Sequence, residues 1–136
     1  MIVVDTNTVA YLYIQGQRTH QAEKVLTRDP EWIAPRLWKS EFISVLTFCV
    51  RQKTLSLDSA LVIAQEAQQF MQDNEFDVPS AQVLKLVSTS TCSSYDCEFI
   101  ALAESFQVPL VTSDRAILRE FPSIAVSMER FVLESP

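Results

Sequence analysis

The chain contains almost no glycine and almost no histidine, and both shortages exclude familiar kinds of active site. Gly16 is the single glycine among 136 residues, so neither a phosphate-binding P-loop nor a glycine-rich dinucleotide motif can be present. His20 is the single histidine, which leaves no second imidazole for a two-histidine zinc site. No other residue supports a serine–histidine–aspartate triad. Catalysis would have to come from other side chains.

Cysteine and long apolar runs are scarce as well. Cys49, Cys92 and Cys97 form neither an even disulfide framework nor a C-x-x-C pair, so we interpret them as free thiols in a cytoplasmic protein. No apolar run reaches the roughly 18 residues of a membrane span, and the N-terminus lacks the features of a signal peptide. The length favours one domain that covers residues 1–136.

The net charge of −6 is, at first sight, unfavourable for a nucleic-acid substrate, because proteins that bind nucleic acids usually carry a basic surface. The objection weakens if several acidic residues surround a metal site, since bound divalent ions would neutralise them. The positions of the acids along the chain therefore matter more than their total.

Short apolar runs alternate with helical periodicities along the whole chain. The pattern predicts strands at 2–4, 32–34, 76–78, 109–112 and 124–127. It predicts helices at 6–14, 19–28, from Pro35 through Cys49, and at 57–72, 80–89, 94–106 and 115–120. Strands that alternate with helices indicate an α/β fold, in which a parallel sheet is covered by helices on both faces.

Two aspartates follow predicted strands. Asp5 comes directly after the strand at 2–4, and Asp114 comes just after the strand at 109–112. Parallel α/β sheets bind their ligands beyond the carboxyl ends of the strands, so both residues are candidates for a functional site. Each is equally suited to cap the helix that follows it, and position alone leaves both interpretations open.

Two further acids occupy notable positions on helices. Asp96 ends an S-x-x-D capping box that begins at Ser93, yet it also heads a core-facing row of its helix. Glu41 lies on or beside the apolar face of its helix, between Trp38 and Val45. An unpaired carboxylate that is desolvated there costs on the order of several kcal/mol. A salt bridge to one of the few lysines or a metal shared with other acids would compensate that cost.

All four acids could meet at one end of the sheet. Clustered carboxylates raise one another's pKa unless cations hold them together. Mg²⁺ and Mn²⁺ prefer oxygen ligands and retain several water molecules. A pair of such ions can activate water and stabilise the leaving oxygen of a phosphodiester. The spacing is compatible with such a site, although each acid taken alone also has a structural explanation.

Three segments of the chain resemble PIN-domain nucleases, especially the VapC-type toxins of toxin–antitoxin pairs. They are the opening Ile2-Val3-Val4-Asp5-Thr6-Asn7, the central Trp38-Lys39-Ser40-Glu41, and the stretch from Ser94 through Asp114. The resemblance implies a three-layer α/β/α sandwich with a short central parallel sheet. It also implies an endoribonuclease that depends on Mg²⁺ or Mn²⁺, cleaves translation-related RNA, is restrained by a cognate antitoxin and is often a homodimer.

The same resemblance assigns roles to individual residues. Asp5 and Asp96 would be the main metal ligands, Asp114 would complete the site, and Glu41 would hold a metal-bound water or act as general base. The polar residues that would orient these ligands are Asn7 and Thr112. Toxin members often carry asparagine where Ser44 stands, which puts fine detail of the site in question. Basic residues could supply phosphate contacts around the acids, although ordinary solvated surface explains any one of them better: Arg18, Arg36, Lys39, Arg115 and Arg119.

Other families fit the sequence less well. Phosphotransferases of the haloacid-dehalogenase type need a second aspartate where Asn7 stands, and phospho-receiver domains need a late lysine, whereas none follows Lys85. Two alternatives remain: a PIN nuclease that acts in RNA processing outside toxin–antitoxin systems, and a PIN-like module that binds without catalysis.

Overall fold

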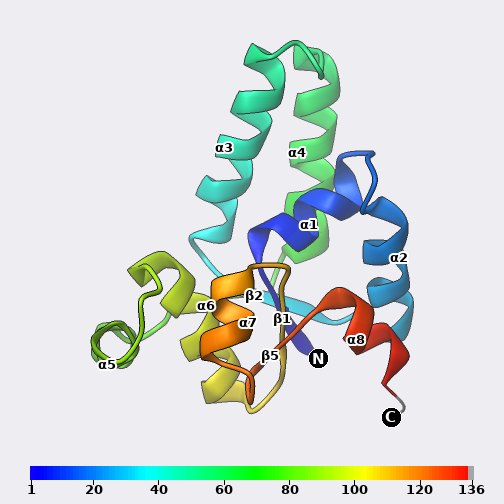
Figure 1. Ribbon diagram of the computed structural model, residues 1–136. Coiled ribbons are helices and arrows are strands. Elements are labelled where there is room, and N and C mark those ends of the chain that lie inside the picture. The colour runs from blue at the N-terminus through cyan, green and yellow to red at the C-terminus, as the bar shows by residue number, and fades with distance from the viewer. Residues whose placement is uncertain (135–136) are drawn as a thin grey trace.

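A parallel sheet with buried central strands forms the centre of the fold. The computed structural model describes residues 1–134, and Figure 1 shows how their helices surround the sheet. The strands are β1 (Ile2–Val4), β2 (Trp32–Pro35), β3 (Glu75–Phe76), β4 (Leu110–Val111) and β5 (Ala125–Val126). They lie in the order β3-β2-β1-β4-β5, and every neighbouring pair is parallel. The predicted α/β class with a short parallel sheet is thereby confirmed.

β1 lies in the middle of the sheet, at the point where the order of strands changes direction. On one side Val3 pairs with Ile33 of β2, and on the other side it pairs with Leu110 of β4. The apolar side chains of these strands are almost completely buried, as their short β-branched runs require. The carboxyl ends of β1 and β4 are consequently neighbours, and this is where open α/β sheets usually bind ligands.

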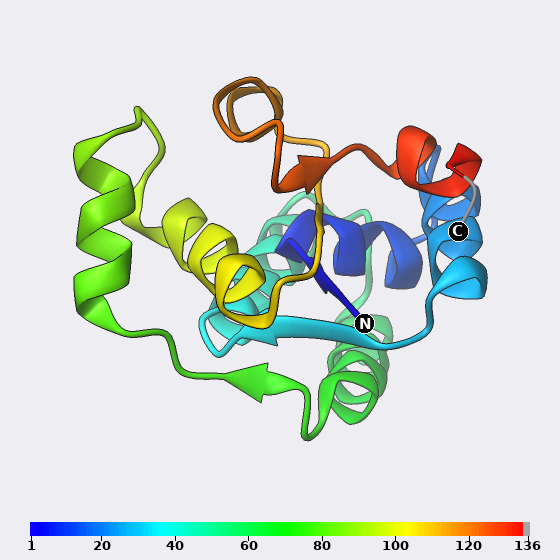
Figure 2. The same ribbon diagram turned by 90° about the horizontal axis from the view of Figure 1, so that it is seen from below.

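Helices form a layer on each face of the sheet. They are α1 (Thr6–Tyr13), α2 (Thr19–Arg28), α3 (Trp38–Arg51), α4 (Leu57–Met71), α5 (Ser80–Ser88), α6 (Ser94–Phe106), α7 (Arg115–Glu120) and α8 (Met128–Leu133). α6 packs on β1, β2 and β4 with α5 outside it, while α1 and α4 lie on the opposite face (Figures 1 and 2). No helix among residues 1–134 combines the length and the hydropathy of a membrane span.

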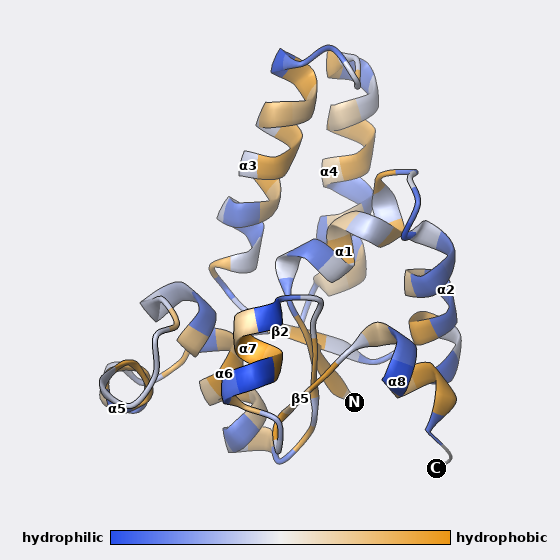
Figure 3. Ribbon diagram, viewed as in Figure 1, coloured by the Kyte–Doolittle hydropathy of each residue, from blue (hydrophilic) through white to orange (hydrophobic). Residues whose placement is uncertain are grey.

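α3 and α4 form an antiparallel pair that projects beyond the sheet (Figure 1). Figure 3 shows apolar residues along both helices of this pair, including its projecting part. Phe48 is 64% exposed and Leu57 is 62% exposed. At the sheet end of α3, by contrast, Trp38 and Phe42 are fully buried, so the helix is anchored at its start and free toward its tip.

Besides shifts of one or two residues at the ends of other elements, two details differ from the predicted elements. Pro35 ends β2 rather than beginning α3, which starts at Trp38. The N–H groups of Ala34 and Arg36 donate to the neighbouring segment around β3, so the residue between them needs no donor and proline fits. α8 was not predicted, although Ser127 caps it by accepting a hydrogen bond from the Arg130 N–H group at 3.1 Å.

Candidate active site

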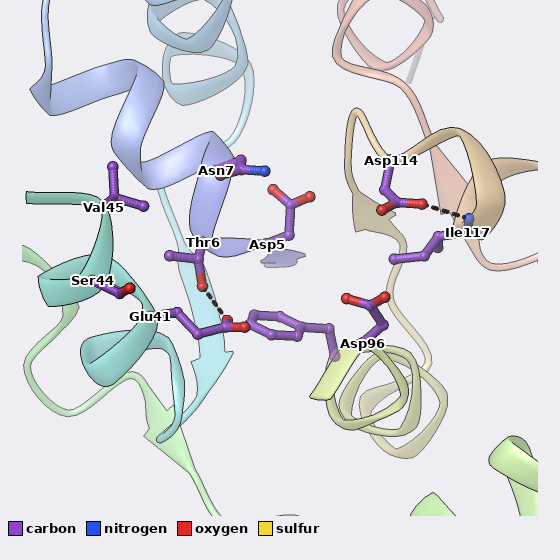
Figure 4. Close-up of a pocket in the computed structure, with 10 residues that line it drawn as sticks. Asp5, Thr6, Asn7, Glu41, Ser44, Val45, Asp96, Asp114 and Ile117 are labelled. Carbon is purple, nitrogen blue, oxygen red and sulfur yellow. Dashed lines mark hydrogen bonds between the residues drawn. The ribbon is translucent and has the colours of Figure 1, made fainter. Parts of the chain in front are cut away.

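The four predicted acids line one hollow at the carboxyl ends of β1 and β4. The hollow measures about 290 Å³, and Figure 4 shows Asp5, Glu41, Asp96 and Asp114 around it. The remaining side chains in its wall are those of Thr6, Asn7, Ser44, Val45, Phe99 and Ile117. The topology thus brings together acids from α3, from α6 and from the turns that follow β1 and β4.

Asp5 caps α1 and also lines the hollow, so the capping interpretation of its position does not exclude a place in the candidate site. Its Oδ1 accepts hydrogen bonds from the Thr8 N–H group at 2.9 Å and from the Thr8 hydroxyl at 2.7 Å. Its Oδ2 accepts a hydrogen bond from the Thr112 hydroxyl. Burial raises the pKa of Asp5, the bonds from Thr112 and Thr8 oppose that rise, and the charge of Asp114 adds to it.

Asp114 is held in the same manner at the end of β4. It caps α7 by accepting a hydrogen bond from the Ile117 N–H group at 3.0 Å. The Thr112 hydroxyl oxygen accepts a hydrogen bond from the Asp114 N–H group at 3.0 Å while its proton is donated to Asp5. Thr112 is fully buried, so one hydroxyl fixes the spacing of the two acids that end neighbouring strands.

Glu41 reaches the hollow from the first turn of α3. Its Oε1 accepts a hydrogen bond from the Thr6 hydroxyl at 2.7 Å, which Figure 4 draws as a dashed line. Burial raises the pKa of Glu41, as do the charges of Asp96, Asp5 and Glu98, whereas the Thr6 bond lowers it. No salt bridge within residues 1–134 involves this carboxylate.

Asp96 enters the hollow from the N-terminus of α6. The Ser93 hydroxyl accepts a hydrogen bond from the Asp96 N–H group at 3.1 Å, so the serine half of the expected capping box forms. The Asp96 carboxylate points toward Asp114 across the hollow (Figure 4). Burial raises the pKa of Asp96, the charge of Asp114 raises it further, Ser93 lowers it, and Asp5 contributes a smaller rise.

Among residues 1–134, no basic side chain lines this hollow. Arg36 forms an ion pair with Asp77 at 2.9 Å, Lys39 lines a different hollow beside α4, and Arg18 belongs to the hollow next door. Arg115 and Arg119 do not reach the wall of the acid hollow either. The five basic residues that could supply phosphate contacts are therefore absent from the wall itself.

The donor chemistry of the hollow suits a hard divalent cation. All four acids offer oxygen ligands, and their mutual repulsion is relieved by no cation of the protein in the wall. As the side chains stand, no three Asp, Glu, His or Cys residues within 1–134 converge around one point as ligands of a single ion. Mg²⁺ commonly uses only one or two carboxylates and fills its other positions with water and phosphate oxygens. The residues present fit an ion bound in that water-rich way.

Two polar residues complete the picture of the predicted site. Asn7 is exposed on the first turn of α1 and lines the acid hollow. Ser44 is exposed on α3 and lines the same hollow, at the position where toxin members often carry asparagine. Sequence reasoning did not single out Thr6 and Thr8, which hold Glu41 and Asp5. Both lie in the stretch that follows Asp5, and a hydroxyl so close to a strand-end acid is the signal that could have found them.

Comparison with known proteins gives concordant results. The family model described as "PIN domain" matches residues 2–122. Ribonuclease VapC3 of Pyrobaculum aerophilum is 30% identical over 128 residues, which covers 90% of this chain and 96% of that protein.

Solved structures share the fold. The crystal structure of PAE2754 from Pyrobaculum aerophilum has a TM-score of 0.77 at 19% identity, and the match covers 97% of this chain and 93% of that one. FitAcB from Neisseria gonorrhoeae has a TM-score of 0.74 at 15% identity, and the match covers 95% of this chain and 99% of that one. A toxin–antitoxin complex from Klebsiella pneumoniae has a TM-score of 0.69 at 15% identity, and the match covers 94% of this chain and 98% of the matched one.

Proposed function

Because the chain belongs to the PIN-domain family, we propose that it is a metal-dependent endoribonuclease and the toxin of a toxin–antitoxin pair. The observation that carries the proposal is the hollow at the carboxyl ends of β1 and β4, which four carboxylates line and no cationic side chain enters. Similarity to a curated ribonuclease over nearly the whole chain supports the same activity.

The arrangement of acids suggests how the chain would use a metal. Bound Mg²⁺ or Mn²⁺ would supply positive charge for the phosphodiester and lower the pKa of a water molecule. Asp5 and Asp96 would hold the ion, and Asp114 would complete its surroundings. Threonine hydroxyls keep Asp5 and Glu41 in fixed orientations.

Glu41 is the carboxylate best suited to receive a proton. Its Oε1 accepts the Thr6 bond, so Oε2 is the atom that would take a proton from the attacking water. Burial and neighbouring acids raise the pKa of Glu41, which makes this carboxylate a stronger base than an exposed glutamate. The Thr6 bond to Oε1 would keep Oε2 pointing into the hollow during the reaction.

The partners follow from the proposed class. Translation-related RNA would be the substrate in the cytoplasm, and a cognate antitoxin would restrain the enzyme. A homodimer would be its assembly state. The Klebsiella pneumoniae neighbour, solved as a toxin–antitoxin complex, supports the idea of an antitoxin partner.

A cleavage assay tests the proposal. The wild-type chain, Asp5→Asn and Asp96→Asn are each incubated with total RNA, with and without Mg²⁺ or Mn²⁺. The wild type should cut only with metal, and both variants should be slower by about 100-fold or more, because each loses a charged ligand. Asp29→Asn is the matched control, since Asp29 is an acid at the opposite end of the sheet. Equal cutting by all four proteins would refute the proposed site.

A further inference from the structure

A second hollow borders the acid hollow and shares two of its residues, Asn7 and Val45. It measures about 410 Å³, within the roughly 300–1,000 Å³ of small-molecule sites. The other residues in its wall come from α1, the α1–α2 connection and α3: Ala10, Tyr11, Ile14, Gln15, Gly16, Gln17, Arg18, Thr19 and Cys49. A group bound here would contact Asn7 and Val45, which also line the acid hollow.

One wall of this hollow is a stack of two flat, delocalised groups. The Arg18 guanidinium lies over the Tyr11 ring, with its central carbon 5.5 Å from the ring centroid. The Tyr11 hydroxyl lies 3.2 Å from the Ser113 hydroxyl, next to Asp114 in the chain. Arg18 has an ion-pair contact with Glu129 at 4.0 Å, and its side chain stays 46% exposed. Tyr11 is thus held by Ser113 on the side of the acids, while Arg18 is partly exposed to solvent on the other side.

Two free amides stand beside the stack. Gln15 and Gln17 are exposed, and within residues 1–134 neither side chain is hydrogen-bonded to another protein group. Their loop is nevertheless ordered, because the Thr19 hydroxyl accepts a bond from the Gly16 N–H group at 2.9 Å and donates to the Ile14 carbonyl at 3.3 Å. Each amide offers both donors and an acceptor.

We propose that this second hollow holds one nucleobase of the RNA, next to the phosphodiester at the acids. The inference rests on the proposed ribonuclease activity and extends it to substrate recognition. Unpaired RNA bases commonly stack on aromatic rings or guanidinium planes and expose hydrogen-bonding edges to side chains. Tyr11 and Arg18 provide the stacking surface, and Gln15 and Gln17 contact the edge of the base. Asn7, shared by both hollows, lies where the sugar–phosphate backbone passes between them.

The test uses the RNA that the wild type cuts best and a series in which one nucleotide near the cut bond is made abasic. Removal of one particular base should lower wild-type kcat/KM about ten-fold, the effect of losing one stacked base. Tyr11→Leu and Arg18→Met should cut intact RNA about ten-fold more slowly and lose most of this discrimination. Tyr11→Phe should keep it, since the ring remains and only the bond to Ser113 is lost.

Arg28→Met is the matched control. Arg28 lies 5.1 Å from the centroid of Phe131 in an equivalent stack near α8, away from both hollows, so its loss should leave discrimination unchanged. Wild-type cleavage that ignores every abasic position, or discrimination that survives in Tyr11→Leu, would overturn the inference. Discrimination that survives in Tyr11→Leu would instead favour a protein partner as the occupant of this hollow.

A binding assay separates this inference from the proposed activity. Short RNA and its abasic counterparts are bound to the protein in a chelator, where no turnover occurs. If the wild type cuts no RNA, the proposed function fails, and the binding data alone decide on the subsite. Tighter binding of intact RNA that Tyr11→Leu abolishes supports the subsite, and equal binding of intact and abasic RNA refutes it.

Discussion

Acidic side chains gather at both ends of the sheet, but in opposite electrostatic settings. Before β2, Asp29 and Glu31 face the N-terminal ammonium group of Met1, whose nitrogen lies 2.7 Å from Asp29 Oδ2 and 3.7 Å from Glu31 Oε1. After β1 and β4, four carboxylates face one another, and the hollow they line contains no cationic side chain. The charges before the strands stabilise the fold, whereas those after the strands oppose it.

The contrast shows where the chain accepts an electrostatic cost. A cluster of like charges raises the pKa of its members and destabilises the folded state at neutral pH. Proteins commonly retain such destabilising arrangements where activity depends on them. The threonine hydroxyls around Asp5 and Glu41 limit that cost with hydrogen bonds that carry no charge, and among residues 1–134 no cationic side chain lines the space between the acids.

The largest effect should come from giving the acid hollow a cation of its own. In Ser44→Lys an ammonium group would occupy the wall beside Glu41, much as Met1 accompanies Asp29. RNA cleavage at the lowest Mg²⁺ concentration that saturates the wild type should fall on the order of 100-fold, because the lysine competes with the metal for the acids. Ser40→Lys places the same charge on α3 outside the hollow and should cut normally. An unchanged rate in Ser44→Lys would show that the hollow holds no catalytic metal.

A smaller effect is expected when the acids keep their charge but lose the hydroxyls that orient them. Thr112→Val removes the group between Asp5 and Asp114, and Thr6→Val frees Glu41. Each should lower cleavage about 10- to 100-fold, as is typical for residues that orient metal ligands. Thr27→Val is the control, because Thr27 bonds only the Glu23 carbonyl of its own helix. Wild-type rates in both variants would mean that the acids hold their positions without these bonds.

The smallest effect should be on stability, with opposite signs at the two ends of the sheet. In metal-free protein at neutral pH, Asp96→Asn should raise the free energy of unfolding by about 0.5–1 kcal/mol, whereas Asp29→Asn should lower it by up to about 1 kcal/mol. Thermal denaturation measures both. Because the pKa of Asp96 is raised in the folded state, its destabilising effect is present at neutral pH and fades as the pH falls through that pKa. The advantage of Asp96→Asn should therefore shrink in acid; an advantage that grows would contradict the assignment.

The sequence was sufficient to predict which acids meet, because that follows from topology. Asp5 and Asp114 end strands that are parallel neighbours, so placing the strands placed both acids at the same end of the sheet. Capping and site formation were weighed as competing explanations for Asp5, Asp96 and Asp114. For Asp5 and Asp114 both hold, because each carboxylate caps a helix and also lines the hollow. At α6 the cap is Ser93, and the Asp96 carboxylate lines the hollow without capping the helix.

What could not be predicted depends on side-chain geometry across long sequence distances. The Thr6 bond to Glu41 spans 35 residues, and the Thr112 bond to Asp5 spans 107. Periodicity reveals which face of a helix is apolar, but it does not reveal where an arginine points, so the sequence left open whether Arg18 and Arg36 lie at the acids or on ordinary surface. Arg36 satisfies Asp77 instead, and Arg18 lies over Tyr11.

The central place of β1 has a consequence for protein synthesis. Of the two strands that pair with β1, β2 is synthesised soon after it. The other, β4, covers residues 110–111 and is followed directly by Thr112, so it is synthesised much later. Until that segment has left the ribosome, Asp5 has neither Asp114 nor its hydroxyl anchor beside it. The β4 side of the acid hollow therefore stays incomplete until this later segment has been made and has paired with β1.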